Sequence, residues 1–479
     1  MSDRTRIPEF SDSLNWVNTT APPSVEECRG KVMLIYFWTP SNVNSLNFLP
    51  EIRALENKHE NGLVVVGIVC PKFPREGSTA SILKAVNRLF LRHAVAMDAD
   101  FNMWQQYGVK AWPTAAVVDA EGCLRKMVSG DEVEKKLDAM VSTLLDEAAS
   151  REIRNYGSLR MSRKPEKSAI LQFPTCIHHD REHVYISDTG NNRILELTEN
   201  GRILRVFGSG NPGFWDGMLE NSGFNAPRGL AVAENYLYVA DSGNHAIRRV
   251  NLFSGEIETV MGTGKPGRQV VSGQTALREI EMMMPMGLVA HGPNLYITMA
   301  GMNQIWRLDL KNNHVSWLSG SGQHGLVNGK ASRAAFATPM GIALHNKTAF
   351  VIDADSSAVR EISLGSGGVR TKAGRGTFTF GREDGGRTKA LMQFPTDACL
   401  SANREQLWIA DTFNNCLRLM DISSGQITTP AIEHEFHEPT CVRCHDRKLW
   451  VADTNAHSII CVHLADRACE PFDIIETGI

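Results

Sequence analysis

The chain has 479 residues, enough for about three domains of ordinary size. Apolar residues make up 42% of it and charged residues 22%, a balance typical of a protein that buries extensive cores. The formal net charge of −3 argues against a general nucleic-acid binder, which would need a strongly basic surface.

The N-terminal sequence gives no sign of export. Residues 1–8 lack the apolar stretch of a secretory signal, and the apolar run at 63–70 has only the length of a strand. The ten cysteines are scattered, and without an export signal we expect them to be reduced. We therefore expect a cytoplasmic protein with no membrane span.

The first predicted domain, residues 1–152, alternates strands with helices. The predicted elements are a strand at 32–38, a helix at 45–59, a strand at 63–69, a helix at 79–92, a β-hairpin at 114–128 and a long helix that starts at Asp131. Alternation of this kind predicts an α/β fold in which helices pack on a sheet.

The first strand leads into a loop with the layout of a thioredoxin redox loop, but without its cysteines. The two positions of the C-x-x-C motif hold Asn42 and Ser45. Thiol–disulfide exchange needs a thiolate and a second sulfur, and an amide and a hydroxyl supply neither. The sequence therefore favours binding over redox catalysis, and we expect no enzymatic activity.

Trp112-Pro113-Thr114 precedes the hairpin, where thioredoxin folds place a cis-proline that faces the redox loop. We predict a cis bond between Trp112 and Pro113, because a cis bond before proline costs far less than any other cis peptide. The backbone beside such a proline can pair with an extended peptide. The candidate partner-binding residues are therefore Trp38, Ser41, Asn42, Ser45, Trp112 and Pro113.

Six repeats fill residues 170–479, after a polar linker at 153–169. Each repeat starts with a proline followed by short apolar strands, and four strands are visible in most copies. The prolines are Pro174, Pro227, Pro285, Pro339, Pro395 and Pro439. Short strands in units of this length predict a six-bladed β-propeller.

An aspartate ends the second strand of five repeats. These residues are Asp188, Asp241, Asp353, Asp411 and Asp453. Equivalent copies around a ring indicate structural carboxylates that accept backbone N–H bonds rather than catalytic groups. The third repeat has Met299 at this position, so that blade is either structurally relaxed or locally adapted.

Together these features resemble the NHL repeat-containing protein 2 family, which joins a thioredoxin-like domain to an NHL propeller. The resemblance rests on segments such as Phe37-Trp38-Thr39, Leu49-Pro50 and Trp112-Pro113-Thr114, and on the Asp-Thr/Ser-x-Asn turns of the repeats. It implies an N-terminal α/β thioredoxin-like fold followed by an all-β six-bladed NHL β-propeller. We identify the chain as a bacterial-type member without the family's redox cysteines and without its further C-terminal domain.

The leading functional prediction is a non-catalytic scaffold, adaptor or assembly factor. The propeller face and the groove near Asn42 would bind protein partners, either an extended peptide or a subunit of a redox metalloenzyme, and not nucleic acid. A second possibility is a thiol–disulfide oxidoreductase-like protein that uses Cys70. A third is a metal-dependent propeller lyase or hydrolase. We expect no cofactor and no bound metal.

Two further patterns resemble haem or metal sites. Cys441-Val442-Arg443-Cys444-His445 matches a haem attachment motif, but lies in the first strand of repeat six, where Cys441 replaces a glycine near the axis. His291, His345 and His445 each follow a repeat proline by six residues, which predicts turn residues on one rim rather than a shared metal site.

Glycine motifs of the form G-x-G-x-x-G start at Gly208, Gly262 and Gly320. A dinucleotide site needs one such loop between a strand and a helix, so three copies at blade spacing indicate loops between blades. We also expect the ring to close by pairing of residues 168–173 with residues 472–475.

Overall fold

The computed structural model describes residues 5–19, 21–129, 133–157, 166, 168–267 and 276–476. For residues 133–136 it describes the backbone alone. They form two compact units, residues 1–167 and 168–479. Two residues of the expected linker contact the first unit: the Asn155 amide donates to the Gly30 carbonyl at 2.9 Å, and Glu166 accepts from Lys84 at 2.7 Å. Of the expected linker, positions 158–165 and 167 lie outside the described residues, as does Asp131.

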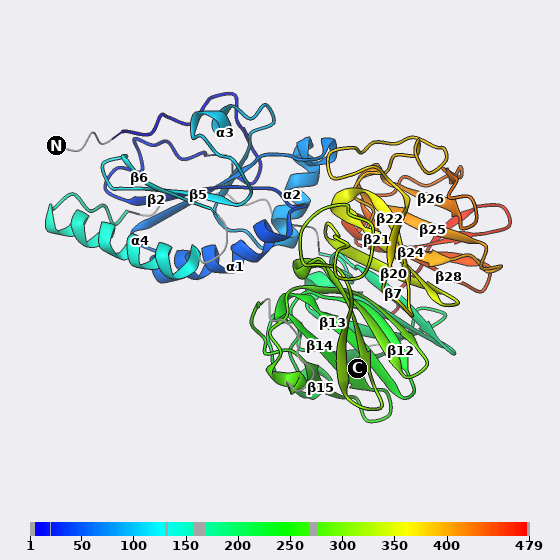
Figure 1. Cartoon of the computed structure of the whole chain (residues 1–479). Helices are drawn as coiled ribbons and strands as arrows, with labels where there is room; N and C mark the ends of the chain where they lie inside the picture. The colour runs from blue at the N-terminus through cyan, green and yellow to red at the C-terminus, as the bar shows by residue number, and fades with distance from the viewer. Residues whose placement is uncertain are drawn as a thin grey trace. The chain divides into compact units, whose positions relative to one another are not determined.

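A six-stranded mixed sheet organises the first unit, in the order β1-β4-β3-β2-β5-β6 (Figure 1). The strands are β1 (Asn15–Trp16), β2 (Val32–Trp38), β3 (Leu63–Val69), β4 (Ala94–Met97), β5 (Thr114–Val118) and β6 (Leu124–Ser129). The helices are α1 (Val43–Lys58), α2 (Thr79–Arg88), α3 (Asn102–Gln106) and α4 (Val133–Ser150), with a 3₁₀ turn η1 (Pro74–Gly77). In the described parts of the chain, no helix has the length and apolar character needed to cross a bilayer.

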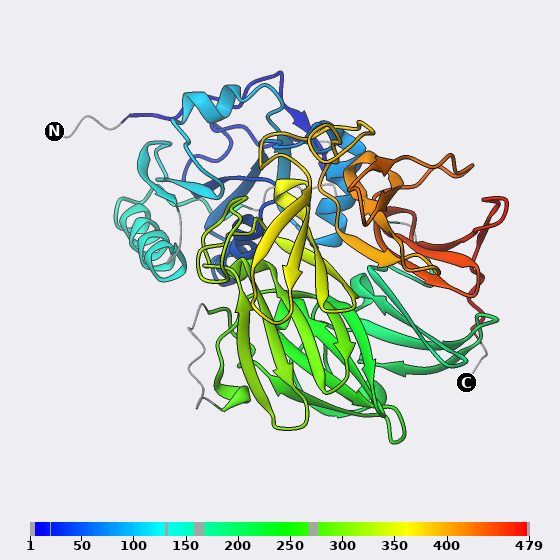
Figure 2. The same cartoon turned by 45° about the vertical axis from the view of Figure 1, so that its right-hand side comes forward.

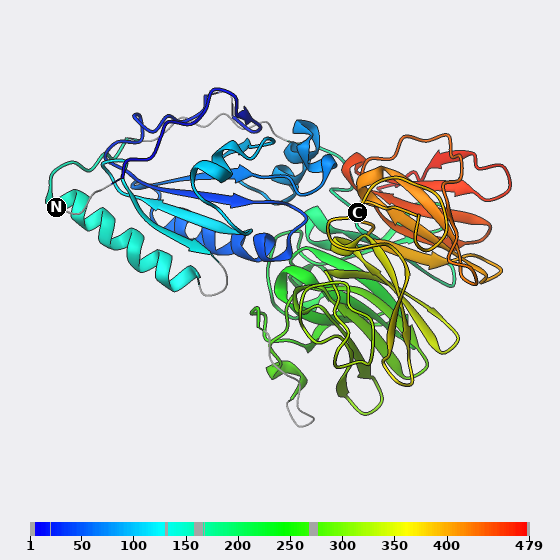
Figure 3. The ribbon, with the colours of Figure 1, turned by 45° about the horizontal axis from the view of Figure 1, so that its top comes forward.

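Strand β2 lies at the centre of this sheet and is buried on both faces. Alternate side chains of a strand point to opposite faces. Leu34, Tyr36 and Trp38 therefore enter one core with residues of α1, α2 and α4, while Ile35 and Phe37 enter the other with residues of α3. Figure 3 shows α1 and α4 on the same face of the sheet. The predicted α/β fold and the cis Trp112–Pro113 bond are confirmed.

The second unit is a six-bladed β-propeller, as predicted, and each blade is a sheet of consecutive strands. Blade one consists of β7 (Cys176–Asp180), β8 (His183–Asp188), β9 (Arg193–Thr198) and β10 (Ile203–Phe207). Blade two consists of β12 (Pro227–Ala233), β13 (Tyr236–Asp241), β14 (Ala246–Asn251) and β15 (Glu256–Met261), with β11 (Gly217–Met218) at its outer edge. Blade three consists of β16 (Pro285–His291), β17 (Asn294–Met299), β18 (Gln304–Asp309) and β19 (His314–Ser319). Blade four consists of β20 (Pro339–His345), β21 (Thr348–Asp353), β22 (Ala358–Ser363) and β23 (Val369–Ala373). Blade five consists of β24 (Asp397–Leu400), β25 (Gln406–Asp411), β26 (Cys416–Asp421) and β27 (Ile427–Thr428). Blade six consists of β28 (Pro439–His445), β29 (Lys448–Asp453), β30 (Ser458–His463) and β31 (Cys469–Pro471).

The three glycine motifs follow the outer strands of the first three blades. Gly208 comes directly after β10, Gly262 after β15 and Gly320 after β19. Each motif therefore starts a loop that leads to the next blade, which confirms the prediction. Within the part of the chain that the structure describes, none of the three motifs leads from a strand into an α-helix, which is the setting that a dinucleotide site requires.

The repeated aspartates are structural, as predicted. All five carboxylates are fully buried, and each accepts a backbone N–H from the segment that leads into its own blade, at 2.5–2.8 Å. The donors are the amides of Gln172, Asn225, Ala337, Gln393 and His437. Each carboxylate therefore fastens the incoming segment to the end of the second strand.

In blades two, four and five the aspartate also pairs with a buried arginine seven residues further on. The pairs are Asp241–Arg248, Asp353–Arg360 and Asp411–Arg418, at 2.8–3.1 Å. Blade three replaces both members with apolar residues, Met299 and Trp306, which share one core. Because the charged pair is replaced as a whole, blade three is locally adapted and no charge is left unpaired there.

Adjacent blades are joined by a repeated contact that we call the blade latch. In every blade a 3₁₀ turn follows the second strand, and the residue after this turn has a left-handed φ of 48–58°. Its side chain accepts the N–H that precedes the next blade's proline, at 2.9–3.2 Å. The six acceptors are Asn192, His245, Asn303, Ser357, Asn415 and His457. Asparagine suits this role because it tolerates the left-handed conformation better than most residues.

The ring closes differently from our expectation. Residues 168–173 form no strand, and Ile475 instead pairs with Arg202 at the start of β10. The last latch, from the Phe173 amide to His457 Nδ1 at 3.1 Å, joins blade six to blade one. The Thr454 hydroxyl also donates to the Pro174 carbonyl at 2.7 Å. Figure 2 shows the first blade, in blue-green, beside the last, in red.

The latch at His245 is expected to make the propeller sensitive to acid. Burial lowers the pKa of His245 to about 4, below the usual value of 6.5. The unfolded chain therefore takes up the proton first, so this stabilisation is complete above pH 6.5 and is lost as the pH falls towards 4. We expect His245→Asn to reduce the loss of propeller stability between pH 7.5 and 4.5 by about 2 kcal/mol. Urea unfolding at the two pH values measures this difference.

Two features make His245→Asn a sharp test. Asparagine already serves as the latch in blades one, three and five, so the hydrogen bond is kept while the titrating group is removed. His291→Asn is the matched control, because His291 is exposed. If His245→Asn and the wild type lose the same stability on acidification, the latch is not the source of the pH dependence.

Candidate functional site

The loop that would carry redox cysteines is used here to start helix α1. Asn42 is the N-cap residue, and its Oδ1 accepts the backbone N–H of Ser45 at 2.9 Å. Asparagine is among the strongest N-cap residues. The Ser45 hydroxyl accepts the Thr39 amide at 3.4 Å. Both positions of the former C-x-x-C motif are therefore engaged in backbone hydrogen bonds.

Burial limits which candidate residues can reach a partner. Ser45 and Trp38 are 0% exposed, and Ser41 and Pro113 are also buried. Asn42 and Trp112 are partly exposed, and the neighbouring Asn44 is exposed. A partner that approaches this loop therefore meets Asn42, Asn44 and Trp112 first.

A buried carboxylate that sequence reasoning missed holds the loop in place. Glu76, on η1, is 1% exposed, and its two oxygens accept the backbone amides of Ser41, Lys72 and Phe73 at 2.8–3.0 Å. Burial raises the pKa of Glu76, and the hydrogen bonds from the Phe73 and Ser41 amides oppose the shift. Glu76 thus connects the redox-type loop to the segment after β3.

Cys70 lies beside this loop but is poorly suited to nucleophilic chemistry. Its amide donates to the Trp38 carbonyl at 3.0 Å, and its sulfur lies 3.8 Å from Asp98 Oδ2. The side chain is fully buried. Burial and the Asp98 carboxylate both raise the pKa of the Cys70 thiol, so the reactive thiolate is disfavoured.

Three aromatic residues form what we call the aromatic shelf: Phe101, Trp104 and Trp112. All three are partly exposed, and the rings of Trp104 and Trp112 lie 4.9 Å apart. Phe37 pairs with Thr114, which places Trp112 at the same sheet edge as the end of β2. The Trp104 amide donates to Asp98 at the end of β4. The shelf and the redox-type loop therefore occupy one edge of the sheet.

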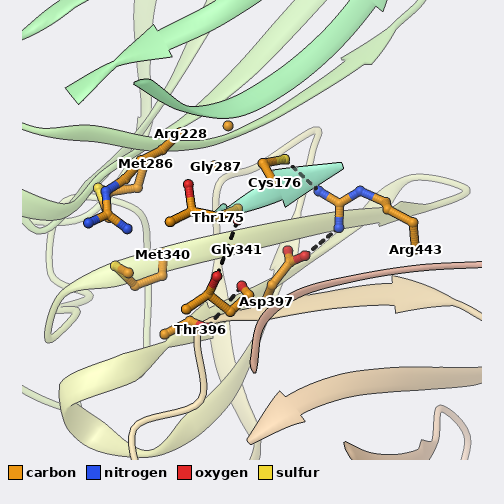
Figure 4. Close-up of a pocket in the computed structure, with 12 residues that line it drawn as sticks. Thr175, Cys176, Arg228, Met286, Gly287, Met340, Gly341, Thr396, Asp397 and Arg443 are labelled. Carbon is orange, nitrogen blue, oxygen red and sulfur yellow. Dashed lines mark hydrogen bonds and ion pairs between the residues drawn. The ribbon is translucent and has the colours of Figure 1, made fainter. Parts of the chain in front are cut away.

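A second candidate site lies on the propeller axis, where the first strands of the six blades meet (Figure 4). The cavity there holds about 40 Å³, and its lining residues are Thr175, Cys176, Arg228, Gly229, Met286, Gly287, Met340, Gly341, Thr396, Asp397, Thr440 and Arg443. Its walls differ around the ring, because glycines line one side while Cys176, Asp397 and Arg443 line the other.

The histidines and cysteines that could suggest a metal site do not come together in the propeller. His291, His345 and His445 each end the first strand of a blade, in blades three, four and six. His445 instead stacks on His179 of blade one, with ring centroids 4.3 Å apart. Adjacent strand residues point to opposite faces, so Cys444 and His445 diverge. Among the described residues, no group of three histidine, cysteine or acidic side chains could hold a metal ion.

Comparison with known proteins agrees with this architecture. Residues 30–124 match the family model described as thioredoxin-like. NHL repeat-containing protein 2 of Bos taurus is 32% identical over 98% of this chain and 72% of its own length. This chain belongs to the NHL repeat-containing protein 2 family. Protein SUPPRESSOR OF QUENCHING 1, chloroplastic, of Arabidopsis thaliana is 32% identical over 89% of this chain and 42% of its own length.

Solved structures show a weaker likeness. A streptogramin B lyase structure has a TM-score of 0.43 and 14% sequence identity, and the match covers 65% of this chain and 86% of the lyase. For this member of the NHL repeat-containing protein 2 family, the sequence relatives therefore carry the family assignment.

Sequence reasoning overlooked three residues at these sites: Glu76, Trp104 and Arg443. The segment Phe73-Pro74-Arg75-Glu76 carries a signal for the first, because proline followed by glutamate is typical of a helical start. No local pattern marks Trp104 in this family member, and the haem-type motif at 441–445 gives no sign of the role of Arg443. Their importance depends on contacts with residues far away in the sequence.

Proposed function

We propose that this protein is a non-catalytic scaffold or assembly factor that binds protein partners. The observation that carries the proposal is the sheet edge of the first unit. There the cysteine positions serve as a helix cap and a buried hydroxyl, while the partly exposed Trp104 and Trp112 lie at the same edge. Tryptophan is enriched among residues that dominate protein interfaces.

The geometry favours a partner segment that runs over the loop and the aromatic shelf. Asn42 is partly exposed in the loop, Trp112 lies at the same sheet edge, and large aromatic surfaces gain most from being covered. An extended peptide, or an exposed segment of a redox metalloenzyme subunit, fits these requirements. The propeller face would supply a second contact surface, and the cytoplasm would be the place of action.

Two alternatives have less support. An oxidoreductase that uses Cys70 would need a thiolate, but burial and Asp98 raise the pKa of this thiol. A propeller lyase with a histidine-bound metal would need converging ligands, and no three histidine, cysteine or acidic side chains in the described part of the chain lie close enough together to hold a metal ion.

A site-specific photo-crosslinking experiment tests the binding proposal. A photoreactive phenylalanine analogue at Asn44 lies beside the predicted contact, whereas the same group at the exposed Asn61 lies just before β3, at the other end of the sheet. We expect one protein to be crosslinked from position 44 and not from position 61. Trp112→Ala should weaken this crosslink at least about tenfold, as expected for an interface anchor worth more than 1 kcal/mol.

The outcomes separate the two units. A partner crosslinked equally from positions 44 and 61, and unaffected by Trp112→Ala, would contradict binding at this sheet edge. If position 44 crosslinks no partner while the full chain still captures one, the propeller would be the unit that binds it.

A further inference from the structure

The residue two positions after each blade's proline occupies the same place in the first strand, and in five of the six blades it lines the axial cavity. In blades two, three and four it is Gly229, Gly287 and Gly341, all of which line the axial cavity. In blades five, six and one it is Asp397, Cys441 and Cys176. Two cysteines thus occupy equivalent positions in the blades that close the ring.

These axial positions come into close contact between neighbouring blades. A β-carbon at Gly229 would lie 3.1 Å from the Cα of Gly287, and one at Gly287 would lie 3.2 Å from the Cα of Gly341. Cys441 of blade six and Cys176 of blade one are neighbours in the same way. The amide of Ile177, the residue next to Cys176, donates to Cys441 Sγ at 3.3 Å. A disulfide needs α-carbons about 4.4–6.8 Å apart, a spacing compatible with such packing.

The surroundings of the two sulfurs differ in a way that favours reaction at Cys176. Arg443 Nη2 lies 3.6 Å from Cys176 Sγ, and Arg443 is held by Asp397 through its other terminal nitrogen. Figure 4 shows the Cys176 sulfur directed towards this guanidinium. A hydrogen bond from Cys441 lowers the pKa of the Cys176 thiol, and Arg443 adds to the shift against the opposing effect of burial. Burial raises the pKa of Cys441, which therefore remains the proton donor of the pair.

We propose that Cys176 and Cys441 form a peroxide-reactive dithiol, which oxidation converts into a disulfide between the first and last blades. The Cys176 thiolate attacks one oxygen of hydrogen peroxide, the O–O bond breaks, and hydroxide leaves to give the sulfenic acid. Cys441 then attacks the Cys176 sulfur, the S–OH bond breaks, and the thiol proton leaves with the hydroxyl as water. Two thiols and one peroxide thus give one disulfide and two waters.

The size of the axial cavity selects the oxidant. Its volume of about 40 Å³ admits a molecule as small as water or hydrogen peroxide, but not a glutathione-sized disulfide. Cys176 lines this cavity, whereas Cys441 lies behind it and is almost completely buried. Small peroxides should therefore react first at Cys176, with Cys441 as the resolving thiol.

Peptide mapping of the full-length protein tests the proposal. The folded protein is treated with hydrogen peroxide, its remaining thiols are blocked with N-ethylmaleimide under denaturing conditions, and it is digested with trypsin. Cleavage after Arg443 separates Cys441 from Cys444, so the expected product is peptide 168–181 linked to peptide 419–443. One link should form per peroxide consumed, and dithiothreitol should reverse it. Cys123, which is buried in the first unit, should stay reduced.

Two variants identify the order of the steps. Cys441→Gly carries the residue that blades two to four have at this position, and it should leave Cys176 as a sulfenic acid that dimedone labels. Cys399→Ala removes another buried cysteine of the propeller and should leave the link intact. The proposal is overturned if peroxide that already oxidises the half-buried Cys469 gives no 176–441 link, or if the link appears only after unfolding in urea.

Discussion

Breaking the buried ion pair of blade four is expected to destabilise the propeller strongly. Asp353→Met leaves the Arg360 guanidinium without its carboxylate, and Arg360→Trp leaves Asp353 without its cation. Both side chains are fully buried, so either single change leaves an uncompensated charge in the interior. We expect each single variant to lose about 3–5 kcal/mol of unfolding free energy, as is typical when one partner of a buried pair is removed. Urea unfolding followed by tryptophan fluorescence measures the loss.

The double variant Asp353→Met/Arg360→Trp copies the residues of blade three, Met299 and Trp306. It removes both charges together, so it should recover at least about 2 kcal/mol relative to the sum of the single losses. Part of the loss should remain, because Arg360 also donates to the Val327 and Ala335 carbonyls at 2.8 Å. Additive single losses would show that the two residues act independently.

A pair on the same blade with an exposed arginine provides the control. Arg370 pairs with Glu361 at 2.6 Å, but its side chain is 66% exposed. Exposed pairs contribute at most about 1 kcal/mol, so Arg370→Met should change stability little. A loss as large as that of Arg360→Trp would mean that burial does not determine the cost.

Replacing Glu76 is expected to have the largest effect in the first unit. In Glu76→Leu the amides of Ser41, Lys72 and Phe73 lose their bonds to the carboxylate. A buried donor that loses its acceptor costs about 1–3 kcal/mol, so we expect a total loss of at least about 3 kcal/mol for the first unit. Hydrogen exchange should also become faster at the Ser41 and Phe73 amides, which would show that the loop itself has loosened.

Two further substitutions isolate the carboxylate's role. Glu76→Gln keeps one carbonyl oxygen for the Lys72 and Phe73 amides, so it should lose less than Glu76→Leu. Gly77→Ala tests the turn itself, since a β-carbon there would have no atom within 4 Å, and it should be near neutral. A Glu76→Gln variant as unstable as Glu76→Leu would mean that the negative charge, and not the acceptor geometry, holds the loop.

The repeats were predictable from sequence because the same local contacts recur in each copy. A proline, an apolar strand and a terminal aspartate are all visible within one blade, and the buried carboxylates followed from their repetition. The blade-three exception also had a local signal, since Met299 and Trp306 replace aspartate and arginine together. Most of the propeller fold could therefore be predicted from patterns within a single blade.

The details of both candidate sites were less predictable, because distant segments create them. Ser45 belongs to the C-x-x-C position, yet the start of α1 turns its side chain inward, which no local pattern reveals. Cys176 and Cys441 meet only because blade six closes on blade one. The expected closure by residues 168–173 was wrong because every blade already has its four strands from its own repeat.

The self-contained blades have a consequence for how the ring is assembled. Apart from β11, which pairs with β15 at the outer edge of blade two, every strand pairing within a blade joins neighbours in sequence, whereas the last latch joins Phe173 to His457, 284 residues away. During synthesis the first five blades can fold while the inner strand of blade one still lacks its neighbour. The final contact is thus an intramolecular docking of two finished surfaces, and its entropic cost rises only with the logarithm of the intervening length. Until it forms, blade one can accept the sixth blade of another copy, which makes this junction the natural point for domain swapping.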